Sequence, residues 1–189
     1  MTKKIFKGSA MLSPVPSVLI TSKNENKINV FTAAWVGMAC TKPPMVTVAI
    51  RPERLSYEFI KKSGEFVINL PTKSMAKIVD YCGVVSGRDH DKIKEMSLSL
   101  EECSSVSVPM IGECPICLEC NVKNIIKLGS HDLFLSEIAA VDVDESIIDK
   151  KGKIHFEKAN LISYCHGNYF SLQPKSLGKF GFSVNKHKK

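Results

Sequence analysis

Groups that could hold a phosphate are spread over the stretch from residue 51 to residue 92. Arg51 ends a predicted buried strand, and Ser56 lies in the first turns of a predicted helix, where free backbone N–H groups favour an anion. The run Ser86-Gly87-Arg88 supplies a hydroxyl, a flexible backbone and a guanidinium, and Lys92 lies at the start of the next predicted helical turn. Each group alone is more often a solvated surface residue, so a phosphate site here is a hypothesis about all of them together.

A second set of residues could frame a planar ring. Trp35 is the only tryptophan and follows a predicted strand that contains Asn29 and Thr32. An aromatic ring beside hydrogen-bonding groups suits a flat heterocycle, whereas filling of the core is an equally good interpretation. The segment from Gly83 to Gly87 has two glycines but lacks the spacing of a dinucleotide-binding turn, and no phosphate loop is present.

The most conspicuous cysteines form the run Cys114-Pro-Ile-Cys117-Leu-Glu-Cys120. Two successive two-residue spacings resemble part of an iron–sulfur ligand run, but Asn124 stands where the fourth ligand would be. The residues from 116 to 123 alternate as in a strand, which would send Cys117 to the face opposite Cys114 and Cys120. Buried structural cysteines are therefore favoured, and a metal-binding or thiol-redox module is the alternative.

The composition is that of an ordinary cytosolic globular chain. The length of 189 residues predicts a single domain over 1–189, and a hydrophobic share of 44% is typical of a globular protein. The net charge of +7 comes almost entirely from six lysines at the two ends, so we expect a nearly neutral body with basic, mobile ends over 1–8 and 184–189. This pattern argues against a nucleic-acid surface, and no apolar run approaches the roughly 20 residues of a membrane span. Seven cysteines without a secretion signal predict reduced thiols and a cytoplasmic location.

The elements that would position these groups are mainly strands. Apolar runs and alternation predict strands over 15–21, 28–34, 45–50, 66–70, 161–164 and 169–172, and a hairpin with arms 116–126 and 133–143. Short helices are predicted after Pro52, ending at Ser63-Gly64, and after Thr72. Many strands with few short helices predict a mainly β fold with a barrel-like core.

In order along residues 10–172, the chain resembles the flavin reductase-like family and is closest to its flavoredoxin members. The resemblance rests on Pro14-Val-Pro, Asn29-Val-Phe-Thr-Ala-Ala-Trp35, Lys42-Pro-Pro-Met-Val-Thr-Val, Ser63-Gly-Glu-Phe-Val-Ile-Asn-Leu70, Cys82-Gly83, Ser86-Gly-Arg-Asp-His-Asp-Lys92 and Gly129-Ser-His131. It implies an FMN-binding split β-barrel, usually a homodimer with the flavin near the subunit interface.

The same resemblance implies a set of FMN-binding residues. Those along the flavin and its ribityl chain would be Asn29, Phe31, Thr32, Ala33, Ala34 and Trp35. Those around the phosphate would be Arg51, Ser56, Ser86, Gly87 and Lys92, with Cys82 nearby and with His131 and Tyr164 close to the ring. The flavin performs the redox step, so no catalytic side chain and no metal are expected.

The resemblance leaves two functions open within one class. The first is an FMN-dependent NAD(P)H oxidoreductase, and the second is an electron carrier that exchanges electrons with a redox protein. FMN is expected rather than FAD, because phosphate-compatible groups are present without a dinucleotide pattern. The alternative from another class is a cysteine-rich metal- or thiol-redox module without flavin.

Overall fold

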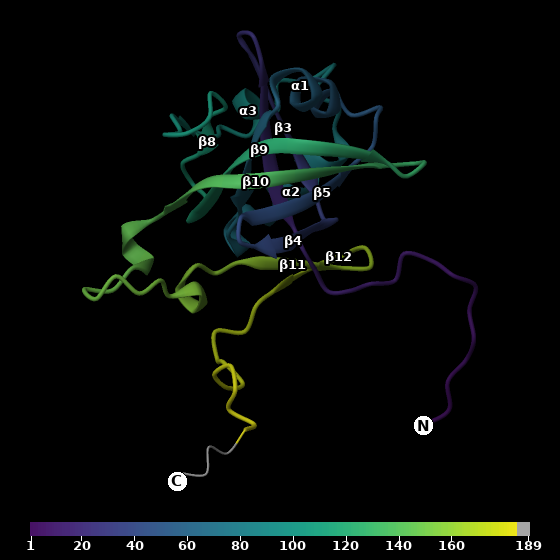
Figure 1. Ribbon diagram of the computed structural model, residues 1–189, viewed down its shortest axis with the longest axis vertical. Coiled ribbons are helices and arrows are strands. Elements are labelled where there is room, and N and C mark those ends of the chain that lie inside the picture. Colours follow the sequence, from purple (N-terminus) through teal and green to yellow (C-terminus); the bar gives the residue numbers. More distant parts are fainter. Residues whose placement is uncertain (185–189) are drawn as a thin grey trace.

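The computed structural model describes residues 1–184 and consists mainly of antiparallel strands (Figure 1). Seven strands form one sheet in the order β3-β2-β6-β9-β10-β5-β4, and β1, β11 and β12 form a second, smaller sheet. The strands of the large sheet are β2 Val18–Asn24, β3 Lys27–Ala33, β4 Val36–Thr41, β5 Pro44–Ile50, β6 Glu65–Leu70, β9 Ile116–Lys127 and β10 Asp132–Val143. The others are β1 Val15–Pro16, β7 Leu100–Glu101, β8 Met110–Ile111, β11 Ile162–Cys165 and β12 Asn168–Ser171.

The large sheet curls around a hydrophobic core. Phe31 of β3 and Val48 of β5 lie in the same buried cluster, although four strands separate β3 from β5 in the sheet. Phe66 of β6 and Phe134 of β10 are completely buried between them. Residues of β2, β3, β5, β6, β9 and β10 thus point into a barrel, which is the mainly β, barrel-like fold predicted from the sequence.

The outer face of the sheet carries a second core under short helices. Helix α2 (Ala76–Val84) contributes Val79 and Cys82, which pack with Leu19 and Val67 from the outer faces of β2 and β6. Helix α1 (Leu55–Ser63) packs against β2, and α3 (Lys92–Glu95) is a single turn near β3. Helical 3-10 turns are η1 Lys73–Met75, η2 Glu145–Ile147 and η3 Phe156–Lys158. Helix α1 ends where it was predicted to end, because Gly64 adopts the left-handed conformation with φ 74° and donates to Ile60.

The fold differs from the sequence prediction in several places. The strand predicted over 15–21 is two strands, because β1 pairs with β11 in the small sheet whereas β2 pairs with β3 and β6 in the large one. The short pair of β7 and β8 was not predicted either. Strand β4 was not predicted, because its side chains, Met38 and Cys40 included, are almost all exposed and show no buried face. It forms because its backbone pairs with β5. Strand β2 continues to Asn24, beyond the predicted strand end at residue 21, and the turn is confined to Glu25 and Asn26.

The cysteine run is placed partly as predicted. Cys117 lies in the outer core and Cys120 in the barrel core, so the two do occupy opposite faces of β9. The prediction for Cys114 was wrong: it precedes the strand in a turn and lies with Cys117 in the outer core. Burial raises the pKa of Cys117 and of Cys120 to about 12 and raises that of Cys114 further, which keeps the thiols protonated. Within residues 1–184, no three His, Cys, Asp or Glu side chains are arranged to hold a metal ion.

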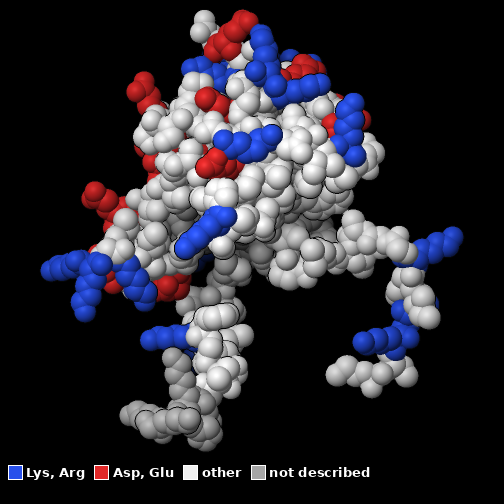
Figure 2. All heavy atoms as spheres, in the orientation of Figure 1, with Lys and Arg blue, Asp and Glu red and all other residues white. Residues whose placement is uncertain are grey.

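The segment before β1 and the segment from β12 to residue 184 both extend away from the barrel (Figure 1). The segment before β1 has no regular secondary structure and is exposed, and Figure 2 shows lysines along this arm while both charge signs mix over the body. The predicted basic C-terminal end falls almost wholly on residues 185–189, which lie outside the described residues. None of the helices described is long and apolar enough to cross a membrane.

Candidate functional site

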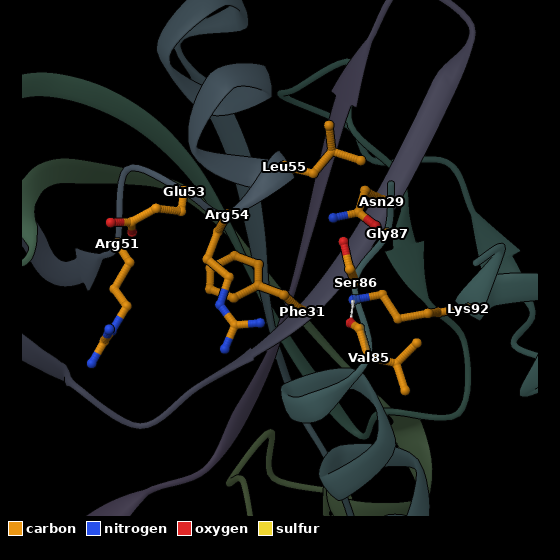
Figure 3. A pocket seen from close by; sticks show the side chains of 10 residues that line it. All are labelled: Asn29, Phe31, Arg51, Glu53, Arg54, Leu55, Val85, Ser86, Gly87 and Lys92. Carbon is orange, nitrogen blue, oxygen red and sulfur yellow. Dashed lines mark hydrogen bonds between the residues drawn. The ribbon is translucent and has the colours of Figure 1, made fainter. Parts of the chain in front are cut away.

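A cationic cavity of about 620 Å³ opens at the N-terminal end of α1 (Figure 3). Its walls come from β3, from the segment between β5 and α1, and from the segment between α2 and α3. Arg51, Arg54 and Lys92 line it together with a single acid, Glu53. The other lining residues are Asn29, Phe31, Leu55, Val85, Ser86 and Gly87. Three cations against one carboxylate make this cavity a suitable site for a phosphate dianion.

Lys92 is the most deeply buried cation of this cavity, with only 3% of its surface exposed. Its ammonium group donates to the carbonyl oxygens of Cys82 at 3.2 Å and of Val85 at 3.1 Å, at the C-terminal end of α2. An ammonium has three donors, so one remains for a ligand. Burial lowers the pKa of Lys92 to about 8, and the positive charge of Arg54 contributes in the same direction. Lys92 is thus mostly charged at neutral pH but easily deprotonated in mild alkali.

Close packing holds Asn29 against Gly87. The Asn29 amide donates to the Ser56 hydroxyl at 2.8 Å, and the Ser22 hydroxyl donates to the same oxygen at 2.7 Å. A Cβ atom on Gly87 would lie 2.0 Å from the Asn29 side-chain oxygen, so no other residue fits there without displacing Asn29. Asn29 and Gly87 therefore form a fixed wall of the cationic cavity.

A second cavity of about 430 Å³ adjoins the first, and it is called the aromatic cavity after the five rings that line it, those of Phe31, Trp35, His131, Tyr164 and Tyr169. Phe31, Arg51 and Arg54 line both cavities. The Trp35 and His131 rings have centroids 4.4 Å apart, and Tyr164 and Tyr169 form another aromatic pair at 5.5 Å. The remaining lining residues are Ser17, Thr32, Ala33, Ala34, Ala49, Ile50, Asp80, Gly83, Val84 and Gly167.

Two polar groups of this aromatic cavity bear on what it can hold. The Ser17 hydroxyl is buried and has no hydrogen-bond partner among residues 1–184, and a polar group on a bound ring could supply one. Burial lowers the pKa of His131, and the nearby Arg51 lowers it further against the opposing effect of Glu53, which favours the neutral imidazole. The uncharged form of the His131 ring is therefore the one favoured beside a ligand. A cationic cavity joined to an aromatic one fits a planar ring that carries a phosphate.

The structure brings together most of the residues expected around FMN. Asn29, Arg51, Ser86, Gly87 and Lys92 line the cationic cavity, and the aromatic cavity includes Thr32, Ala33, Ala34, Trp35, His131 and Tyr164. Phe31 lines both.

Two of the expected residues lie elsewhere. The Ser56 side chain is completely buried behind Asn29, which it supports, and is not part of the cavity wall. The Cys82 side chain lies in the outer core, and only its carbonyl oxygen contacts Lys92.

Sequence reasoning missed Arg54, which lines both cavities. Its guanidinium donates to the Gly83 carbonyl oxygen at 3.0 Å, and this bond connects the start of α1 to α2. Arg54 stands three residues after Arg51, at the beginning of the predicted helix, and this position near a predicted anion site was the only available signal. Ser17, Asp80 and Tyr169 were also missed, because they reach the cavity from distant parts of the chain.

Comparison with known proteins defines the class. The flavin reductase like domain matches residues 11–173. The chain is 28% identical to flavoredoxin of Desulfovibrio vulgaris (Miyazaki F), with a TM-score of 0.90 over 98% of this chain and 100% of that one. Flavoredoxin from Methanosarcina acetivorans is 26% identical, with a TM-score of 0.87 over 98% of each chain. An uncharacterized protein of Archaeoglobus fulgidus is 38% identical over 83% of this chain and 88% of its own.

The chain therefore belongs to the flavin reductase-like family and has its split-barrel fold. It is an FMN-binding redox protein, as the resemblance of its sequence predicted. These comparisons give no support to a cysteine-rich module without flavin, and the positions of Cys114, Cys117 and Cys120 in two separate cores agree with that result.

Proposed function

We propose that FMN binds across the two adjoining cavities, with its phosphate in the cationic cavity and its ring in the aromatic one. The observation that carries this assignment is the pair of cavities itself, because Phe31, Arg51 and Arg54 line both. When bound, FMN supplies the electron-accepting and electron-donating chemistry, which the protein's own side chains lack.

The residues of the cationic cavity would bind and orient the phosphate. Arg51 and Arg54 can donate charge-assisted hydrogen bonds in a fixed planar geometry, and Lys92 adds its third N–H from a buried position. Gly87 keeps the backbone of residues 86–88 close to Asn29, which the Ser56 hydroxyl holds in place.

The residues of the aromatic cavity would position the ring and limit its exposure to water. Trp35 and His131 lie against each other on one part of the wall, and Tyr164 and Tyr169 form another. Ala33 and Ala34 are small, which leaves room beside the backbone of β3 and the residue that follows it. The unpartnered Ser17 hydroxyl is available to a polar edge of the ring.

The physiological reaction that we propose is NAD(P)H oxidation with reduction of FMN, because the family match is to a flavin reductase like domain. The similarity to two flavoredoxins favours a second candidate, an electron carrier that keeps FMN bound and exchanges electrons with a redox protein. We further propose a homodimer, since Met38 of the edge strand β4 and Trp35 just before this strand are exposed apolar side chains. The cytoplasmic location that the cysteine content predicts is proposed with it.

The test begins with the purified protein. Its visible spectrum and the chromatographic identity of any released flavin should show FMN, and titration of the apoprotein should give tighter binding of FMN than of riboflavin or FAD. FAD as the released flavin, or no flavin uptake, would contradict the assignment. Steady-state oxidation of NADH and NADPH is then measured with added FMN. A reductase should oxidise the nicotinamide over many turnovers, whereas an electron carrier should not. Light scattering measures the oligomeric state.

A further inference from the structure

Helix α1 is tied to both walls of the flavin site through two consecutive residues of its first turn. On one side, Ser56 accepts hydrogen bonds from Asn29 of β3 and from Ser22 of β2. On the other side, the Tyr57 hydroxyl donates to the Asp132 carboxylate of β10 at 2.7 Å, across 75 positions of the sequence. The first turn of α1 thus bridges β2 and β3 to β10.

The bond between Tyr57 and Asp132 is buried and well packed. Tyr57 is 9% exposed and Asp132 is 5% exposed, and the Tyr57 ring meets Phe134 edge-on at 5.4 Å. The bond to Asp132, with burial, raises the pKa of Tyr57, so the hydroxyl keeps its proton and remains a donor. A buried bond of this kind holds its two elements at a fixed distance, since breaking it would leave a carboxylate without its partner.

Tyr57 and Asp132 lie next to residues that line the two cavities, but they do not line either cavity themselves. Tyr57 follows Arg54 and Leu55, which line the cationic cavity, and Asp132 follows His131, which lines the aromatic cavity. Asp132 also lies opposite Ile50 in the sheet, next to Arg51, which both cavities share. The hydrogen bond between Tyr57 and Asp132 therefore joins the segment that lines the cationic cavity directly to the strand that lines the aromatic cavity.

We propose that Tyr57 and Asp132 are positioning residues that set the spacing between the phosphate-binding and ring-binding ends of the flavin site. This proposal rests on the proposed placement of FMN across the two cavities. It assigns a role to a residue pair that touches neither the phosphate nor the ring. A ligand that spans both ends needs the correct spacing, whereas a ligand that occupies one end does not.

The test compares FMN with lumiflavin, which has the flavin ring but a methyl group in place of the ribityl phosphate. Tyr57→Phe should raise the Kd of FMN by about tenfold, the usual scale for loss of one buried hydrogen bond to a charged group, and that of lumiflavin by less than about twofold. Asp132→Asn keeps an acceptor oxygen for Tyr57 and should retain the wild-type ratio of the two Kd values. Thr21→Val removes another long-range bond, which the Thr21 hydroxyl donates to the Pro109 carbonyl oxygen at 2.7 Å, together with the bond that it accepts from Asn69 at 3.2 Å. It serves as the control away from the site, with an unchanged ratio.

If Tyr57→Phe does not fold, the double variant Tyr57→Phe/Asp132→Leu carries the same test, because it removes both polar partners and leaves no orphaned carboxylate. The same change in the ratio is expected. Equal losses for FMN and lumiflavin, or an Asp132→Asn variant that changes the ratio as Tyr57→Phe does, would overturn the positioning role. A wild-type protein that binds neither flavin would overturn the proposed function as well, and the two failures are thus distinguishable.

Discussion

Raising the pH above about 8 should weaken the binding of FMN while leaving that of riboflavin almost unchanged. The reason is Lys92, whose ammonium group lies in the cationic cavity and whose pKa burial lowers to about 8. The phosphate of FMN is already a dianion at pH 7, since its second pKa is near 6. Guanidinium groups do not lose their proton in proteins, so the positive charge of this cavity changes through Lys92.

The magnitude follows from the charged fraction of Lys92. About nine-tenths of the side chain is charged one pH unit below its pKa and about one-tenth one unit above it. If the phosphate binds only the charged form, the affinity for FMN should fall by about tenfold between pH 7 and pH 9, or about 1.4 kcal/mol. The affinity for FMN can only fall as the pH rises, because Lys92 must take up a proton on binding whenever it is uncharged in the free protein.

The assay is a flavin fluorescence titration of the apoprotein at several pH values with FMN and, in parallel, riboflavin. Lys92→Met removes the charge but keeps an unbranched apolar side chain, and it should make the FMN affinity weaker and independent of pH. Lys94→Met changes an exposed lysine of the same short helix and should leave the pH profile intact. An affinity for FMN that does not change with pH in the wild type would refute a charge-assisted contact of Lys92 with the phosphate. The same conclusion would follow if the affinity of Lys92→Met changed with pH as steeply as that of the wild type.

Three further predictions concern packing, the cysteines and a histidine loop. Gly87→Ala should lower FMN affinity by about tenfold or more in the same titration, because its Cβ would displace Asn29, whereas Gly37→Ala, with nothing within 4 Å, should not. Denaturant unfolding should show a loss of about 1–2 kcal/mol per site for alanine in place of three buried cysteines. The three sites are Cys114, Cys117 and Cys120. The flavin spectrum of the triple alanine variant should stay unchanged. If the variant lost a bound metal or a non-flavin absorption band that the wild type has, the hypothesis of a metal centre at these cysteines would be supported instead. The His155 ring contacts the carboxylates of Glu157 and Asp149, and these hydrogen bonds raise the pKa of His155 in the folded protein. The stabilisation that His155 contributes is therefore complete below about pH 6.5, its pKa in the unfolded chain, and is lost as the pH rises through the higher pKa of the folded state. Melting temperatures from pH 6 to pH 8.5 should therefore fall more steeply in the wild type than in His155→Gln.

Several parts of this molecule follow from local sequence alone. The apolar runs of β5 and β6 and the long hairpin of β9 and β10 formed as predicted, because alternation and turn residues act over only a few positions. Helix α1 stops at Gly64 for a local reason as well, since glycine adopts the left-handed conformation without a steric cost. The run from Asn29 to Trp35 reaches the site as a unit, because one strand and the two residues after it carry all of it.

The chemistry of the site depends instead on how the sheet curls. Only the tertiary structure places Arg54 between the two cavities, Ser56 behind Asn29 and the Tyr57 hydroxyl on Asp132. These contacts join residues 27 to 75 positions apart, or depend on which side of α1 faces the barrel, and no local pattern encodes them. The lowered pKa of Lys92 is also a tertiary property, because burial beside the end of α2, and not the lysine itself, disfavours the charge.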